Sequence, residues 1–230
     1  QQSDLAEKDV VYNEIHVQKD GRANTVLLSD GSKVILNAAT TFRYPTSFDG
    51  KNRQVYLDGE AYFEISKNSE KPFVVKLKKQ EITVLGTTFN VQAYGHESYS
   101  EVTLLTGRIL LEAFNERGES MSCMYLKPDQ KALSDNSTGS VSLQDVNASL
   151  SNAWINGEYK FKDEPLASIV KRLENYYNVK IHLEDKRLEK IRYTGTFSLD
   201  QDILDVFRII DYEKQLIFKR VEKEIFITSK

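Results

Sequence analysis

The spacing of the hydrophobic residues changes once along the chain, and this change limits the fold more than any other feature. Through residues 26–133, short hydrophobic runs alternate with turn residues, and no helical spacing occurs between them. Strands that recur every ~8–12 residues in this way are typical of an all-β sandwich, barrel or short solenoid. After residue 163 the spacing becomes helical. The sequence therefore predicts two domains of different structural class.

The first segment opens with a predicted hairpin. Residues 26–28 and 33–36 flank Asp30-Gly31, a dipeptide suited to the positive φ angles of a tight turn. Gly59, Gly86 and Gly107 are also expected at turns. We expect an all-β domain over residues 21–134, a sandwich or short β-solenoid of about 10–14 strands. Further strands are predicted at residues 54–57, 61–65, 73–77, 82–85, 89–94, 102–105 and 109–111.

A polar stretch separates the two segments. Residues 134–140 are small and polar, which predicts a linker over residues 135–152. The lead segment, residues 1–20, stays unassigned. Because the chain begins without Met and has no apolar run of ~18–20 residues that could span a bilayer, we interpret it as a processed or excised piece of a longer protein.

The second segment, residues 153–230, repeats a strand–helix–strand pattern. Hydrophobic residues recur with helical spacing from Leu166 to Leu173, with Pro165 in the first turn and Asn178 as a stop. A second helix is predicted from Ser198, because Ser198 and Gln201 form a capping-box pattern. Strands are predicted at residues 179–183, 192–197, 215–221 and 224–228. This pattern predicts a small α+β domain with helices on one face of a small sheet.

Composition excludes several function classes. The net charge is −3, with both signs interspersed, which disfavours nucleic-acid binding. The single cysteine, Cys123, permits no intrachain disulfide, and its apolar neighbours predict a buried side chain. His16, His96 and His182 are isolated, so we expect no metal site. No nucleophile elbow or nucleotide-binding loop is present, so we expect no enzyme and no cofactor.

Three further side chains could carry function. Glu60 and Glu64 lie on the same face of a predicted strand. A solvated face or a structural hydrogen bond explains them better than an acid–base pair. Trp154, the only tryptophan, follows the polar stretch and is expected to anchor the domain junction. A ligand-stacking platform is the alternative role for Trp154.

Several ordered blocks of the first segment resemble the FecR domain. The similarity includes the sequence Val-Leu-Leu-Ser-Asp-Gly-Ser-Lys-Val-Ile-Leu-Asn, the block around Gly59-Glu60-Ala61, and Val-Leu-Gly-Thr-Thr-Phe-Asn-Val. These blocks are residues 26–37, 53–65 and 84–91, with residues 42–45 and 71–75 between them. Residues 154–157, 176–179 and 193–197 resemble the C-terminal domain of Bacteroidetes members. That domain is similar to the short N-terminal module of secretins and TonB-dependent transducers.

The resemblance implies the periplasmic sensor region of a single-pass inner-membrane anti-sigma factor. In that family the periplasmic region contacts the signalling domain of a TonB-dependent outer-membrane transducer. A cytoplasmic part, absent from this chain, controls an extracytoplasmic-function sigma factor. Residues 1–20 would then follow the membrane helix.

The terminal hairpin suggests where such a partner binds. If residues 215–221 or 224–228 form a sheet edge, their free backbone groups could pair with a partner strand. The predicted partner-binding residues are Ile217, Phe218, Ile225, Phe226 and Trp154. The alternative function is a β-sandwich module that binds glycans or surfaces, which requires a groove with exposed aromatic residues among Tyr56, Tyr62, Tyr94 and Tyr99.

Overall fold

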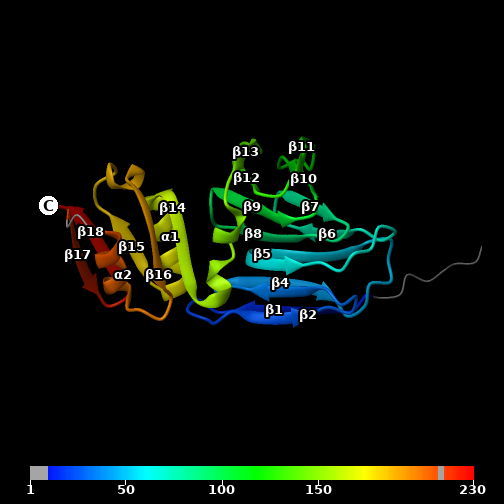
Figure 1. Ribbon diagram of the computed structural model, residues 1–230, viewed down its shortest axis with the longest axis horizontal. Coiled ribbons are helices and arrows are strands. Elements are labelled where there is room, and N and C mark those ends of the chain that lie inside the picture. The colour runs from blue at the N-terminus through cyan, green and yellow to red at the C-terminus, as the bar shows by residue number, and fades with distance from the viewer. Residues whose placement is uncertain (1–9, 212–214) are drawn as a thin grey trace, which may run out of the picture.

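Two domains lie end to end in an elongated molecule (Figure 1). The computed structural model describes residues 10–211 and 215–230. An all-β domain at one end is followed by a small α+β domain that carries residue 230 at the other end. The order of classes predicted from the hydrophobic spacing is therefore confirmed.

Within the described residues, 13 strands of the first domain connect into one sheet that bends around a core. Sheet A denotes the half with the order β1-β4-β5-β6-β7-β10-β11, and sheet B the half with the order β2-β3-β5-β8-β9-β12-β13. Sheet A contains β1 (Tyr12–Val17), β4 (Thr40–Pro45), β6 (Phe73–Lys76), β7 (Gln80–Val84), β10 (Ile109–Phe114) and β11 (Ser120–Leu126). Sheet B contains β2 (Asn24–Leu27), β3 (Lys33–Leu36), β8 (Thr88–Ala93), β9 (Tyr99–Thr106), β12 (Gln130–Asp135) and β13 (Val141–Asp145).

Strand β5 (Arg53–Glu64), 12 residues long, belongs to both halves. Its first part pairs with β4 and β6, and its second part pairs with β3 and β8. Between these parts Gly59 has φ 133°, and a Cβ there would lie 2.6 Å from the Cα of Thr40. Glycine is therefore required where β5 passes from one half to the other. The prediction of a turn at Gly59 is wrong, because a bent strand needs the same backbone freedom as a turn.

The core fills the space between sheets A and B. Strand alternation places Ala61 and Phe63 inward, while Glu60 and Tyr62 point to the outer face of sheet B. The ring of Phe63 stacks on that of Phe89 with centroids 4.8 Å apart. Full burial of such a side chain contributes about 1.5–3 kcal/mol. The outer face of sheet B is thus left for other contacts.

Five strands of the first domain lie outside the predicted set. β1 lies in the lead segment and pairs with β4, and β13 lies within the predicted linker and pairs with β12. β4, β11 and β12 were also not predicted individually. Cys123 lies on β11 and is exposed, so its predicted burial is wrong. β11 has one strand neighbour, β10, and its alternation turns Met121, Cys123 and Tyr125 outward.

The second domain contains the two predicted strand–helix–strand units. These are β14 (Glu158–Pro165), α1 (Leu166–Tyr177) and β15 (Lys180–Leu183), followed by β16 (Arg192–Ser198), α2 (Ile203–Ile210) and β17 (Leu216–Val221). The last strand is β18 (Glu224–Ser229). The strands form two small sheets, β14-β16 and β15-β18-β17, rather than the single sheet expected. Short 3₁₀ helices occur at Ala148–Leu150, Ala153–Asn156 and Leu188–Lys190.

The helix ends show how local sequence acts. α1 ends at Asn178, as predicted, and the φ of Asn178, 51°, is left-handed. Pro165 was predicted in the first turn and lies just before it, as the N-cap. α2 begins later than predicted, because the side chain of Asp202 accepts from the N–H of Leu204 and caps the helix. Ser198 and Gln201 form a separate turn instead, in which the Gln201 side chain accepts from the N–H of Ser198. None of the helices in residues 10–211 and 215–230 has the length and hydropathy of a membrane span.

Candidate functional site: the joint between the domains

Two buried polar networks connect residues that are far apart in the sequence. The first network surrounds the fully buried Arg53. Its Nη1 donates to Oδ2 of Asp30 at 2.6 Å and to the carbonyl of Ser66 at 2.9 Å, and Nε donates to the carbonyl of Lys71 at 2.9 Å. Asp30 also accepts from the N–H and hydroxyl of Ser32. This network fixes the β2–β3 turn to β5, so these motif residues are structural.

The second network begins at Glu60, on the outer face of sheet B, and ends in the second domain. Oε2 of Glu60 accepts from Nδ2 of Asn37 at 2.8 Å, and Oε1 accepts from Nδ2 of Asn90 at 3.0 Å. Oδ1 of Asn90 then accepts from Nε1 of Trp154 at 3.2 Å. This chain connects three motif blocks of the first domain to the only tryptophan.

The orientation of both amides is determined by their other contacts. Oδ1 of Asn37 accepts from the N–H of Ala38 at 2.8 Å, so its Nδ2 must face Glu60. Oδ1 of Asn90 is likewise occupied by the indole N–H of Trp154. Both carboxyl oxygens of Glu60 therefore act as acceptors, a pattern that a carboxylate satisfies and an amide does not.

Burial raises the pKa of Glu60 above its ordinary value. Arg172 of α1 and the two amide donors oppose that increase but do not cancel it. Glu60 is thus a carboxyl group covered by the second domain, with a cation from that domain nearby. The structural role predicted for it is confirmed, and Glu64 forms an exposed ion pair with Lys33 at 2.9 Å.

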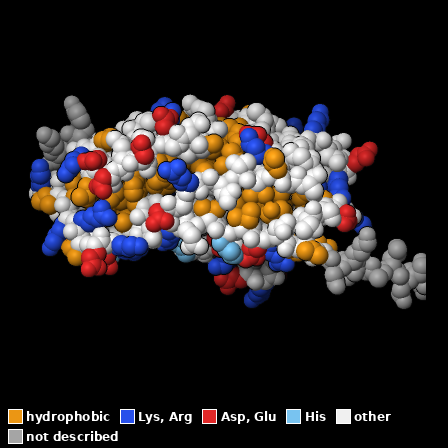
Figure 2. Space-filling model, turned by 90° about the horizontal axis from the view of Figure 1, so that it is seen from below, with side chains coloured by type: hydrophobic (Ala, Val, Ile, Leu, Met, Phe, Trp, Pro, Cys, Tyr) orange, Lys and Arg blue, Asp and Glu red, His pale blue; other side chains and the backbone are white. Residues whose placement is uncertain are grey.

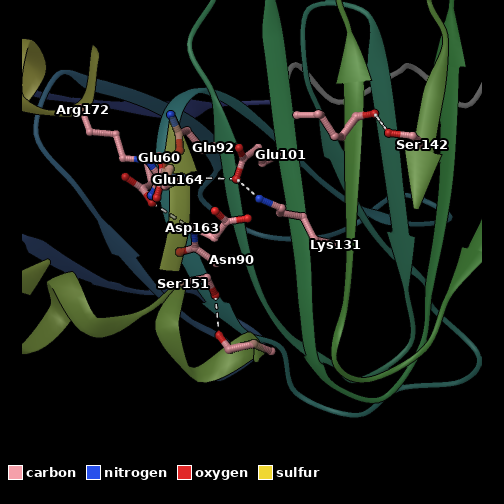
Figure 3. Close-up of polar contacts among 12 residues, drawn as sticks. Glu60, Asn90, Gln92, Glu101, Lys131, Ser142, Ser151, Asp163, Glu164 and Arg172 are labelled. Atoms are coloured by element: carbon pink, nitrogen blue, oxygen red, sulfur yellow. Dashed lines mark hydrogen bonds and ion pairs between the residues drawn. The ribbon is translucent and has the colours of Figure 1, made fainter. Parts of the chain in front are cut away.

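Arg172 connects the two domains by charge (Figure 3). Its Nη2 lies 3.2 Å from Oε2 of Glu101 on β9, and its Nε lies 3.7 Å from Oε1 of Glu164 on β14. Lys131 of β12 also contacts Glu101, at 3.2 Å. Burial would raise the pKa of Glu101, but Arg172 and Lys131 outweigh burial and hold that pKa below its ordinary value. Glu101 is therefore a charged acceptor shared by both domains.

A cleft of about 820 Å³ lies beside this ion cluster. Its floor is the outer face of β9, β12 and β13, and its walls are β14 and α1. Both signs of charge line it, and Tyr99 is its exposed aromatic residue, at 47% exposure. The charged lining residues include Lys131, Lys162, Lys171, Arg172, Arg192, Glu97, Glu101, Asp163 and Glu164.

The predicted partner-binding residues of the terminal hairpin differ in accessibility. β18 lies between β15 and β17, so of the two strands considered as a sheet edge only β17 is one. Ile225 is fully buried, and Phe226 is partly exposed and stacks on His182. β17 is an edge strand, on which Ile217 is 51% exposed and Phe218 is partly buried against Phe207.

Trp154 is buried at the joint, at 7% exposure, so it cannot contact a partner in this conformation. Its contact with Asn90 places it at the domain junction, as expected from its position after the polar stretch.

The tyrosines of the glycan-binding alternative do not meet in one groove. Tyr62 and Tyr94 are buried, and Tyr62 packs with the hydrophobic cluster of the second domain. Tyr56 packs edge-on against Tyr12 and lies under Arg43, while Tyr99 lines the cleft. This arrangement provides no shared aromatic platform for a saccharide.

Sequence reasoning missed Arg172 and Glu101. Arg172 lies on a helix at a position where a solvated cation is ordinary, and Glu101 is a polar residue on an alternating strand. No local signal distinguishes them, because the ion pair between them connects two different domains. In the described residues, no group of three His, Cys, Asp or Glu side chains is placed to hold a metal ion.

Comparisons with known proteins agree with this architecture. The family described as FecR protein matches residues 13–110, and the family described as FecR, C-terminal, matches residues 158–227. No curated protein matches the sequence. A crystal structure at 1.65 Å resolution of a candidate anti-sigma factor from Parabacteroides distasonis ATCC 8503 aligns with TM-score 0.85 and 29% identity. The alignment covers 95% of this chain and 99% of that chain.

A second structure with the same description and organism, at 2.50 Å resolution, aligns with TM-score 0.84 and 29% identity, over 96% of this chain and 100% of that chain. The likeness therefore includes both domains. The chain belongs to the FecR family of anti-sigma factors.

Proposed function

We propose that this chain is the periplasmic sensor region of a membrane-anchored anti-sigma factor. It receives a signal from the signalling domain of a TonB-dependent outer-membrane transducer. A cytoplasmic part outside this sequence passes the signal to an extracytoplasmic-function sigma factor. The proposed role is regulatory, like that of the FecR family to which the chain belongs.

The observation that carries the proposal is the open edge of β17. β17 pairs with β18 on one side and with no other described strand. Its outer face presents Ile217 and Val221, at 51% and 49% exposure. Figure 2 shows hydrophobic side chains on the surface of this domain among charges of both signs. An exposed edge with apolar side chains suits strand addition by a partner.

The register identifies the backbone groups that are available. The N–H of Lys230 donates to the carbonyl of Gln215, and Val221 pairs with Glu224 across the turn. Hydrogen-bonded pairs alternate along an antiparallel ladder, so the N–H groups of Phe218 and Arg220 point to the open edge. A partner strand would accept hydrogen bonds from these two groups.

Two substitutions of Arg220 distinguish the contribution of its backbone N–H to binding from that of its side chain. Proline at position 220 removes the edge N–H, while alanine removes the same side chain and keeps that N–H. The arginine is exposed, and its contact with Asp202 is long, at 3.5 Å. We expect R220P to weaken binding to the signalling domain of a transducer encoded nearby by about tenfold or more, and R220A to bind like the wild type.

The measurement is isothermal titration calorimetry, with circular dichroism to verify folding. Equal affinity of R220P and the wild type would exclude strand addition at β17. Absence of binding between the wild-type chain and the cognate transducer signalling domain would refute the relay itself.

A further inference from the structure

Each domain has its own hydrophobic core. One buried cluster lies wholly within the all-β domain. The second belongs to the α+β domain, and Ile35 and Tyr62 join it from the outer face of sheet B. The connection between the domains contains two short 3₁₀ helices, Ala148–Leu150 and Ala153–Asn156. The domains can therefore separate without opening the core of the all-β domain.

The contact between the domains contains buried polar and charged groups beside the apolar contacts of Ile35 and Tyr62. Glu60, Asn90 and Glu101 of the all-β domain meet Trp154 and Arg172 of the α+β domain. A domain core, in contrast, excludes charged groups unless they are paired. The joint thus resembles a transient protein interface more than a continuous core.

Packing at the joint is also incomplete. A cavity of about 30 Å³, the size of a single water molecule, is lined by Glu60, Tyr94, Trp154, Arg172 and Asn175. Nδ2 of Asn175 is buried and has no hydrogen-bond partner within residues 10–211 and 215–230. A buried donor without a partner reduces the stability of the closed arrangement.

These features make the closed joint only weakly favoured. The desolvation of Glu60, Glu101 and Arg172 offsets much of their mutual attraction. On separation, water would solvate these charges and the orphan amide of Asn175. The apolar contact of Ile35 and Tyr62 favours closure, and so do the contacts of Arg172 with Glu101 and of Trp154 with Asn90, by an amount that desolvation keeps small.

We propose that the joint is a latch that opens as a unit, with Arg172 and Trp154 as the groups that hold it closed. In the closed state Arg172 binds Glu101, and Trp154 binds Asn90. Opening releases the α+β domain from the outer face of sheet B and exposes Trp154, Ile35 and Tyr62. Any ligand that binds the open state more tightly than the closed state shifts this equilibrium. The latch is a property of the chain itself and holds whichever partner binds it.

The single tryptophan provides a direct reporter of the joint. Because Trp154 is buried at the contact, its fluorescence emission and its quenching by acrylamide measure opening of the full chain. The test variant is R172M, which removes the cation and keeps an apolar stem. The matched control is R187M, an arginine of the same domain whose side chain is 85% exposed.

All variants and the wild type are measured at the same pH, pH 8. In R172M the acrylamide quenching constant of Trp154 should rise about twofold or more. Its emission should shift to longer wavelength, and the maximum dimension in small-angle X-ray scattering should increase. The circular dichroism of the helices should stay unchanged. R187M should match the wild type in every measurement.

A second variant acts from the other side of the joint. E101Q weakens the acceptor of Arg172 without changing the α+β domain, so it should expose Trp154 and keep the helical signal. If the acrylamide quenching constant of Trp154 in R172M equals that of the wild type while the helical signal is intact, Arg172 does not hold the joint and the proposal is wrong. If R172M loses helical signal, E101Q decides: the proposal fails unless E101Q exposes Trp154 with the helices folded.

Discussion

Replacement of Arg53 by methionine tests whether the buried motif residues hold the all-β domain together. Arg53 is 1% exposed and bonds to Asp30 and to the carbonyls of Ser66 and Lys71. Loss of one partner from a buried ion pair costs about 3–5 kcal/mol. Asp30 keeps two hydrogen bonds from Ser32, and its side chain is 15% exposed. We therefore expect the lower end of that range, about 3 kcal/mol.

The assay is urea unfolding followed by circular dichroism of the strands, with Trp154 fluorescence as a separate report on the joint between the domains. The control is a double-mutant cycle of R53M, D30N and R53M/D30N. Because D30N removes the charge that R53M leaves unpaired, the double variant should lose less stability than the sum of the two single variants, by about 0.5–3 kcal/mol. If R53M lowers the free energy of unfolding by less than ~1 kcal/mol, the reasoning is refuted, because an ion pair on the surface contributes no more than that.

Three further predictions follow from single positions. G59A should lower the free energy of unfolding by about 2 kcal/mol or more, because the φ of 133° and the close approach of Thr40 leave no room for a Cβ. Thermal unfolding of G59A and the wild type measures this loss. Burial raises the pKa of Glu60 in the folded chain, so the stabilisation linked to its proton is present at acidic pH and is lost as pH rises through that pKa. E60Q lacks this proton, so the free energy of unfolding that it loses relative to the wild type, measured in urea, should be larger at pH 4 than at pH 7. Cys123 should react with a thiol reagent in the folded chain as fast as in the unfolded chain, and slow labelling would show that its side chain is covered.

The sequence by itself determined most local structure. Alternating hydrophobic residues predicted the strands around Asp30-Gly31, and helical spacing between Pro165 and Asn178 predicted α1. These patterns are short-range, because side-chain alternation and capping depend on neighbours a few residues away. For the same reason the change in spacing after residue 163 predicted the order of structural classes, all-β and then α+β, and the motif blocks indicated the family.

The tertiary structure decided what these residues do. The sequence predicts a turn at Gly59, but the residue lies in β5, a strand that sheets A and B share. Only the close approach of Thr40 in the folded chain shows why glycine is needed there. The sequence leaves open whether Glu60 lies on a solvated face or makes a structural hydrogen bond, and only the structure shows that it is buried beside Trp154 and Arg172. Arg172 lies 71 residues from Glu101, its nearest acceptor. A contact between distant segments leaves no local pattern, because its favourable energy arises only when folding brings both side chains out of water together.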